Sequence, residues 1–134
     1  VLDDVGGMDD SLFIDNVDLD WCFRATAAGY SLYGVCAACL QHHLGDARRF
    51  VPGLPRGIVV HSPRRLFYMM RNRALLYRRA YTPRRWIAQD LPRLVIKLLI
   101  FSLLVPPRRA NLRCMLAGLS AGMRGQTTGP PQDA

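Results

Sequence analysis

Helical periodicity over the second half of the chain restricts its fold more than any other feature. Two pairs of a hydroxyl residue and a proline mark helix starts: Ser62-Pro63 and Thr82-Pro83. The hydroxyl can cap free amides, and proline at the first helical position loses no hydrogen bond. Between the pairs, apolar residues recur every three or four positions, and arginines spaced seven apart mark another face: Arg64, Arg71 and Arg78. This pattern predicts an amphipathic, cationic helix.

Two further apolar segments follow that helix. Residues 94–105 are nearly all hydrophobic, but a membrane-spanning helix needs roughly 20 apolar residues, so we expect this stretch to lie in a membrane interface. After two prolines, apolar residues again form a stripe flanked by arginines: Leu112, Met115, Leu116, Leu119 and Met123. We therefore expect residues 62–125 to be a basic, helical, membrane-interface region and residues 126–134 to be a disordered tail.

Residues 1–61 carry a mixed pattern. A helix is expected to begin at Asp18, which would act as its N-cap, and to stop at Gly29. Tyr30–Val35 and Cys36–His43 are expected to form two short strands or one bent strand. A loop over residues 44–57 and a short apolar run, Ile58–Val60, are expected to follow.

Charge divides the chain into two parts. Residues 1–46 hold eight Asp and one Arg, whereas residues 47–134 hold sixteen Arg and one Lys against two Asp. Clustered acids suit general-base or metal chemistry, and a basic, apolar region suits anionic lipid headgroups or phosphates. Nucleic acid would fit the same charge, but the apolar run over 94–105 has no use in a soluble nucleic-acid module. No nucleic-acid partner is therefore expected.

The acidic residues near the start alternate with apolar ones. Residues 9–24 read Asp-Asp-Ser-Leu-Phe-Ile-Asp-Asn-Val-Asp-Leu-Asp-Trp-Cys-Phe-Arg. A solvated acidic face needs no such alternation. The pattern around Asp15, Asp18 and Asp20 predicts carboxylates that enter a partly apolar cleft.

This segment, with Gly6-Gly7 before it, resembles the acceptor-side motif of the rhamnosyltransferases of glycosyltransferase family 2. The resemblance covers residues 5–81 and continues through three more motifs in the family's order: His42-His43-Leu44-Gly45-Asp46, His61-Ser62-Pro63-Arg64-Arg65, and Phe67-Tyr68 with Arg71-Asn72. It implies an α/β fold in which residues 1–61 are the C-terminal portion of a GT-A type (Rossmann-like) catalytic domain, followed by amphipathic, membrane-associating helices. The chain opens on Val1 without an initiator Met, so we expect it to be a fragment. The resemblance implies that the donor-binding half, with its nucleotide-binding strands and metal ligands, is missing, and we expect this chain alone to be inactive.

The resemblance implies an inverting transfer from a nucleotide-sugar donor, expected to be rhamnose from dTDP-rhamnose. The acceptor would be lipid-linked or a polysaccharide, in cell-envelope glycan synthesis. The position that matches the family's general base is Asp18. Many relatives have a Glu directly before this base, where the chain has Val17, so Asp15 and Asp20 are candidates to tune it. Asp20 is also placed to pair with Arg24, four residues on.

A divalent cation, Mg²⁺ or Mn²⁺, is implied by the same resemblance to neutralise the departing diphosphate. The upstream Asp-x-Asp motif that would hold it lies outside this chain, and His42 matches a possible further ligand. A packing or capping role suits His42 equally well. Cys36 and Cys39, with His42 and His43, also offer the ligand types of structural zinc, but a strand would turn the two cysteines to opposite faces.

Further side chains are predicted to bind substrate. Guanidinium groups match phosphate oxygens, and an aromatic face can stack on a sugar ring, although a Trp at this helical position is more often part of a core. The candidates are Asp10, Trp21, Arg24, His61, Arg64, Arg65, Tyr68 and Arg71.

The expected enzyme would be a peripheral protein at the cytoplasmic face of the inner (plasma) membrane. A non-catalytic, cationic module that binds membrane surfaces, or a decayed enzyme remnant, explains residues 62–125 equally well. These alternatives leave the acidic motif without a role. Asp18→Asn separates them, because it would change the enzyme only.

Overall fold

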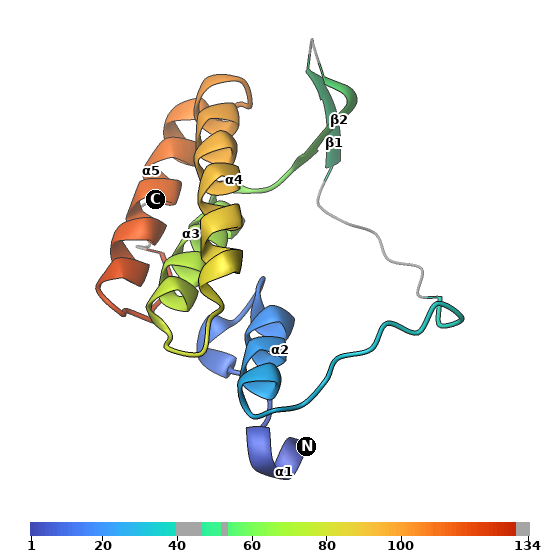
Figure 1. The fold of residues 1–134 in the computed structure, drawn as a ribbon. Helices are drawn as coiled ribbons and strands as arrows, with labels where there is room; N and C mark the ends of the chain where they lie inside the picture. Colours follow the sequence, from blue (N-terminus) through green and yellow to red (C-terminus); the bar gives the residue numbers. More distant parts are fainter. Residues whose placement is uncertain (40–46, 52–53, 131–134) are drawn as a thin grey trace.

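The computed structural model describes residues 1–39, 47–51 and 54–130. Its elements in chain order are α1 (Leu2–Val5), the 3-10 helix η1 (Asp10–Leu12), α2 (Val17–Ala27), β1 (Ala47–Val51), β2 (Leu54–Val60), α3 (Pro63–Arg78), α4 (Arg84–Leu103) and α5 (Arg108–Met123). The helices α3, α4 and α5 lie side by side, α2 lies near one end of this group, and the β1–β2 hairpin extends to one side (Figure 1).

The three long helices share a hydrophobic core. The fully or almost fully buried members of one cluster come from α3, α4, the residues after α4, and α5: Leu66, Met70, Leu94, Phe101, Val105 and Met115. Two glycines let α5 approach α3 closely, because a Cβ at Gly118 or Gly122 would overlap the carbonyl oxygen of Phe67 or Arg71. The close approach fixes α3 as the helix on which the other elements are assembled.

Only one face of the apolar run over residues 94–105 packs into the core. Leu94 and Phe101 of α4 are buried, whereas Val95, Leu99 and Leu103 are exposed. One face of the segment expected in a membrane interface is therefore occupied by the protein itself. No helix of the described ranges is long and apolar enough to cross a bilayer.

The two hydroxyl-proline signals have different outcomes. The Ser62 signal is confirmed, since α3 begins at the next residue and the Ser62 hydroxyl accepts a hydrogen bond from the Arg65 amide at 3.3 Å. The Thr82 cap is wrong, because α4 begins at Arg84 with Pro83 as the N-cap residue and no capping side chain. The Thr82 side chain is instead buried in the protein.

The helix expected from Asp18 is present as α2. It begins at Val17, and its N-cap is Asn16 in a left-handed conformation, so Asp18 lies in the first turn and is not the cap. The expected stop is close to Gly29, whose φ of 92° suits a residue without a Cβ.

The loop expected over residues 44–57 is partly wrong. β1 and β2 form an antiparallel hairpin in which Ala47 pairs with Val60 and Arg49 with Ile58. Residues 44–46 and 52–53 lie outside the described residues. Proline and glycine in β2 suggested a loop, but each strand of a two-stranded sheet has one neighbour only and tolerates such residues at its free edge.

The strand expected at Tyr30–Val35 is wrong. This segment has no regular structure, and Tyr33 is 87% exposed, so the described residues offer it neither a core nor a partner strand. Of the second expected strand, the described part has a turn rather than a strand, and residues 40–43 lie outside the described residues.

The described part of the chain is therefore mainly helical, with one two-stranded antiparallel sheet. The expected α/β character is present only in this hairpin. A parallel, Rossmann-like sheet is not among the described elements.

Candidate functional site

The acidic segment 9–16 contains η1 and ends in a strained loop, residues 13–16, between η1 and α2. Three residues in it that are not glycine have positive φ angles: Phe13 at 61°, Asp15 at 63° and Asn16 at 67°. Such conformations cost free energy for residues with a Cβ, and they persist where surrounding contacts fix them. The contacts around this loop therefore show what its shape depends on.

Asn72 on α3 holds the loop through its backbone. Its side-chain amide donates to the carbonyl oxygens of Leu12 at 2.9 Å, Ile14 at 2.7 Å and Asp15 at 2.9 Å. Asn72 and Leu12 are fully buried, and Ile14 and Asp15 are partly buried. One side chain thus fixes the direction in which Asp15 leaves the loop.

Arg71, the preceding residue, is a buried structural cation. Its guanidinium donates to the carbonyls of Ser11 and Leu12 at 2.9 and 3.1 Å and to carbonyls of Thr127 and Thr128. Burial lowers the pKa of the Arg71 guanidinium. Arg71 was predicted to bind substrate, but its donors are directed into the protein.

The start of the tail after α5 has no helix or strand. Its residues Thr127 and Thr128 nevertheless contact α3, because their carbonyls accept hydrogen bonds from Arg71.

Arg65 pairs with Asp15 where the loop meets the first turn of α3. Its Nε and Nη2 atoms donate to the two carboxylate oxygens, each at 3.1 Å. This fork-to-fork geometry restricts both planes at once. Two residues predicted independently from sequence, one acid and one cation, are therefore brought together across fifty positions of the chain.

A pocket of about 340 Å³ opens beside this pair. It is lined by Phe13, Ile14, Ser62, Arg64, Arg65 and Tyr68. The Phe13 ring is 68% exposed and lies 5.1 Å from the Tyr68 ring, centroid to centroid. Two guanidinium groups beside two aromatic rings can bind an anionic group together with a flat or weakly polar ring, such as a sugar or a base.

Asp20 lies outside this pocket, in a buried cluster of its own. It is 0% exposed and accepts hydrogen bonds from Arg24 at 3.0 Å, from the Tyr81 hydroxyl at 2.6 Å, and from Arg79. The predicted pairing with Arg24 is confirmed. The hydrogen bond to Asp20 and burial together raise the pKa of Tyr81, with burial the larger cause. The arrangement anchors α2 to the end of α3 and leaves Asp20 no open face.

Trp21 and Arg24 use their polar atoms on the chain itself. The Trp21 indole donates to the Gly6 carbonyl at 2.9 Å, and Arg24 donates to the carbonyls of Val5 at 2.6 Å and Gly7 at 2.7 Å. These bonds tie the first residues to α2. Both side chains were predicted to bind substrate, and in the structure they hold backbone.

The remaining predicted residues lie apart from one another. Asp18 is exposed in the first turn of α2, Asp10 is exposed in η1, and Arg64 is exposed at the rim of the pocket. His61 lies in a different cavity, with its ring 6.2 Å from that of Phe101. His42 lies outside the described residues.

The described residues contain no group of three or more His, Cys, Asp or Glu side chains that could hold a metal ion. Cys36 and Cys39 are free and exposed.

Three contributors to this region were missed from the sequence. Phe13 was noted only as an apolar neighbour of the acids, and its exposure is a consequence of the strained loop. Arg79 and Tyr81 lie 59 and 61 residues from Asp20, so no local spacing could have identified them as its partners.

Comparison with curated proteins finds similarity to a sugar transferase. It is the dTDP-rhamnosyl transferase RfbF of Shigella flexneri, which is 31% identical to this chain over 132 residues. The match covers 96% of the chain and 43% of RfbF, so the chain spans less than half the length of that relative. No family model matches the chain, and no solved structure matches it. The similarity supports a glycosyltransferase-like fragment that resembles a rhamnosyltransferase.

Proposed function

We propose that the chain is the acceptor-side part of an inverting, GT-A type glycosyltransferase of family 2. Its reaction moves rhamnose from dTDP-rhamnose to a lipid-linked or polysaccharide acceptor in cell-envelope glycan synthesis. The observation that carries the proposal is the similarity to RfbF along nearly the whole chain. The pocket beside Asp15 and Arg65 adds a place where an anionic substrate with a ring can bind.

Asp18 is the proposed general base. It takes the proton of the acceptor hydroxyl as the new bond to the anomeric carbon forms and the bond to the diphosphate breaks. Its carboxylate is exposed and, among the residues that the structure describes, forms none of the ion pairs that occupy Asp15 and Asp20. The first turn of α2 also favours a negative charge, because the helix dipole is positive there.

Asp15 and Asp20 are proposed as positioning residues. Asp15 fixes Arg65 at the wall of the pocket, and Asp20 fixes the helix that carries Asp18. Arg64 and Arg65 would then bind phosphate oxygens, and Phe13 and Tyr68 would stack against a ring. Arg64 and Arg65, which line the pocket, thus keep the substrate-binding role that the sequence predicts. Arg71 has a structural role instead, because it binds carbonyls of the protein itself.

A divalent cation, Mg²⁺ or Mn²⁺, would neutralise the departing diphosphate in the complete protein. The described residues contain no group of three or more His, Cys, Asp or Glu side chains that could hold it. Its ligands would therefore come mainly from other parts of the protein.

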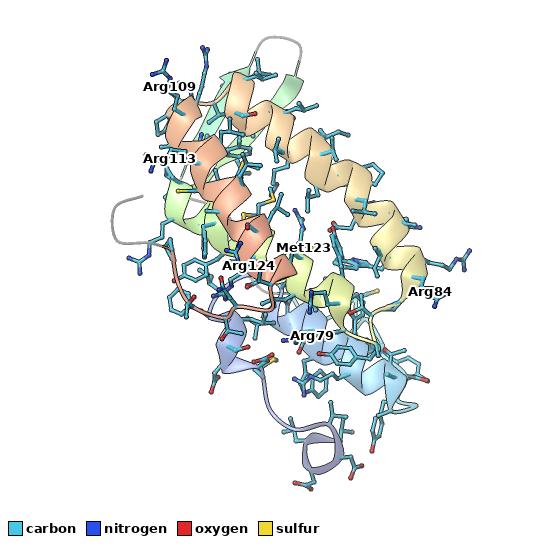
Figure 2. The ribbon with its side chains drawn as sticks, turned by 90° about the vertical axis from the view of Figure 1, so that its left-hand side faces the viewer. Arg79, Arg84, Arg109, Arg113, Met123 and Arg124 are labelled. Atoms are coloured by element: carbon cyan, nitrogen blue, oxygen red, sulfur yellow. The ribbon has the colours of Figure 1, made fainter. Side chains whose placement is uncertain are left out.

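The outer surfaces of α4 and α5 support docking of this part on a membrane surface. Large apolar residues are exposed at helical spacing on both: Leu91, Val95, Leu99, Leu103, Leu112, Leu116 and Met123. Arg84, Arg109 and Arg113 project outward from the same helices (Figure 2). Apolar stripes with flanking arginines bind anionic bilayers peripherally, and we place this surface at the cytoplasmic face of the inner membrane. A non-catalytic membrane-surface module would use the same stripes.

The coding sequence upstream of Val1 tests the proposal directly. We expect an in-frame pattern of strands and helices that contains an Asp-x-Asp motif roughly a hundred or more residues before Asp18. A start codon close to Val1 would contradict the enzyme proposal and favour the membrane-surface module or a decayed remnant.

A further inference from the structure

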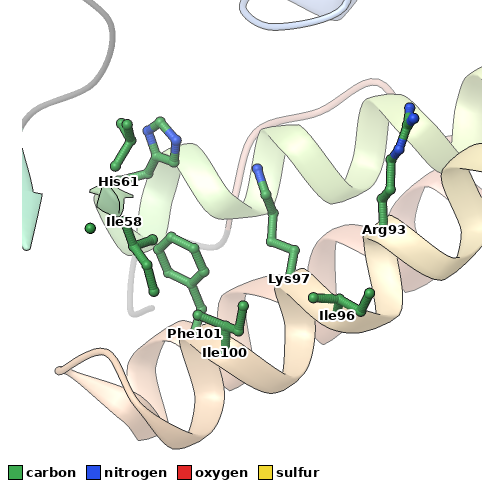
Figure 3. A pocket seen from close by; sticks show the side chains of 9 residues that line it. Ile58, His61, Arg93, Ile96, Lys97, Ile100 and Phe101 are labelled. Atoms are coloured by element: carbon green, nitrogen blue, oxygen red, sulfur yellow. The ribbon is translucent and has the colours of Figure 1, made fainter. Parts of the chain in front are cut away.

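A second cavity lies between the end of β2 and α4. Its volume is about 430 Å³, and it shares no lining residue with the pocket beside Asp15. Ile58, Ile96, Ile100 and Phe101 give it a mainly apolar wall (Figure 3). A cavity of this size and lining suits the apolar part of a small ligand.

Two cations from α4 line the same cavity. Arg93 and Lys97 are one helical turn apart and project to the same side of α4 (Figure 3). Arg93 is exposed, so it lies at the open end, whereas Lys97 is largely covered. The two charges and the apolar wall are thus arranged along one face of the helix.

Among the described residues, no carboxylate accepts a hydrogen bond from the largely covered Lys97 ammonium. Its recorded hydrogen-bond partner there is the Met69 sulfur at 3.9 Å, which is a weak acceptor. The nearest acids are engaged elsewhere, since Asp15 binds Arg65, and Asp90 accepts from the Tyr77 hydroxyl at 2.6 Å. Covering an ammonium group without a strong acceptor costs free energy, and a bound anion would offset this cost.

The surroundings of Lys97 also make its positive charge less stable, which favours binding of an anion. Burial lowers the pKa of its ammonium to about 8, and Arg73 and Arg65 contribute to the decrease, against Asp15 and Asp90. Most molecules are therefore still charged at this position at neutral pH. A bound anion would stabilise the charged form.

We propose that this cavity binds a phosphate-bearing amphiphile, with the phosphate between Lys97 and Arg93 and the apolar chain against Ile96, Ile100 and Phe101. An inorganic anion would use the two cations but leave the apolar wall unused. A neutral hydrocarbon would leave the ammonium without an anion. The proposed binding does not depend on sugar transfer. His61, which lines the cavity, was predicted from the sequence to bind substrate, but neither the phosphate nor the apolar chain is placed on it.

The test is a binding titration of the 134-residue chain with dodecyl phosphate, inorganic phosphate and dodecanol, in a phosphate-free buffer, by calorimetry. We expect dodecyl phosphate to bind at least about tenfold more tightly than either of the others, because it satisfies both parts of the cavity. Equal binding of inorganic phosphate would overturn the amphiphile, and equal binding of dodecanol would overturn the role of the cations.

Variants locate the site. Lys97→Met removes the charge and keeps an unbranched side chain that is one heavy atom shorter. It should weaken dodecyl phosphate binding by about tenfold or more. Arg85→Gln removes one charge from the exposed start of α4, outside the cavity, and should change binding less than twofold. Equal losses in both variants would show a general charge effect and refute the site. Arg93→Gln, at an exposed position, gives a second reading if Lys97→Met does not fold.

Vesicles separate a lipid headgroup from a free phosphate ester as the source. Cosedimentation with phosphatidylcholine vesicles that contain phosphatidic acid should decrease in Lys97→Met relative to Arg85→Gln. If both variants sediment equally while Lys97→Met loses dodecyl phosphate, the cavity takes a soluble phosphate ester with an apolar group, and the lipid source is refuted.

Discussion

Arg65 and Asp15 form a two-pronged ion pair, with both hydrogen bonds at 3.1 Å, that joins the strained acidic loop to the first turn of α3. Arg65 lines the pocket, and Asn72 holds the loop by donating hydrogen bonds to the carbonyls of loop residues such as Asp15. The position of the acidic motif thus depends on α3, far along the chain.

Asn72→Ala should lower the free energy of unfolding by about 3 kcal/mol, because it leaves one buried carbonyl and two partly buried carbonyls without their donor. Urea denaturation measures the loss. Gln89→Ala, which removes an exposed amide from α4, is the control and should change stability by less than about 0.5 kcal/mol. Equal stability of the two variants would show that Asn72 does not hold the loop.

Gly118→Ala should destabilise the protein by about 1–3 kcal/mol, since the new Cβ would overlap the Phe67 carbonyl and push α5 away from α3. Helix propensity alone predicts the opposite, a gain of up to about 1 kcal/mol. The sign of the shift in thermal unfolding therefore decides between them. Ser120→Ala, at an exposed position of α5, should be close to neutral.

Asp20→Asn and Asp18→Asn should differ in stability. Asp20 is buried among Arg24, Arg79 and Tyr81. Removal of its charge leaves the Arg24 guanidinium without its counter-ion and Arg79 with Asp9 alone, at a cost of about 3–5 kcal/mol. Asp18 is exposed, so its substitution should leave thermal unfolding almost unchanged. A large loss for Asp18→Asn would indicate a structural role and remove it as the base.

Lys97 should give stability an upward trend between about pH 8 and pH 10. Its pKa is lowered to about 8 in the folded protein, so the unfolded chain binds more protons in this window, and stability rises with pH. The rise should be about 1–3 kcal/mol in phosphate-free buffer and absent in Lys97→Met. An identical slope in both proteins would show that Lys97 is not desolvated.

The sequence was sufficient where signals are local. The start of α3 at Ser62 depends on a hydroxyl and a proline in adjacent positions, and the Asp20–Arg24 pair depends on helical spacing. It failed where distant parts meet. Arg71 has the appearance of a substrate-binding cation, and only the carbonyls of residues about sixty positions away show that it is part of the scaffold.

The hairpin illustrates a second limit. Glycine and proline are frequent over residues 44–57, which predicts a loop: Gly45, Pro52, Gly53, Pro55 and Gly57. The two segments β1 and β2 form strands through backbone hydrogen bonds to each other, which their side-chain pattern does not indicate. The Lys97 cavity was not predicted either, because its wall combines β2 with α4.

The central claim is that this chain contributes the general base of a sugar transferase. The decisive measurement is the rate of dTDP release from dTDP-rhamnose, in the presence of acceptor, by the longer transferase that contains this chain. We predict that Asp18→Asn lowers the rate by about 100-fold or more, with unchanged thermal unfolding, while Asp3→Asn leaves it unchanged. An Asp18→Asn protein that transfers at the normal rate would contradict the account.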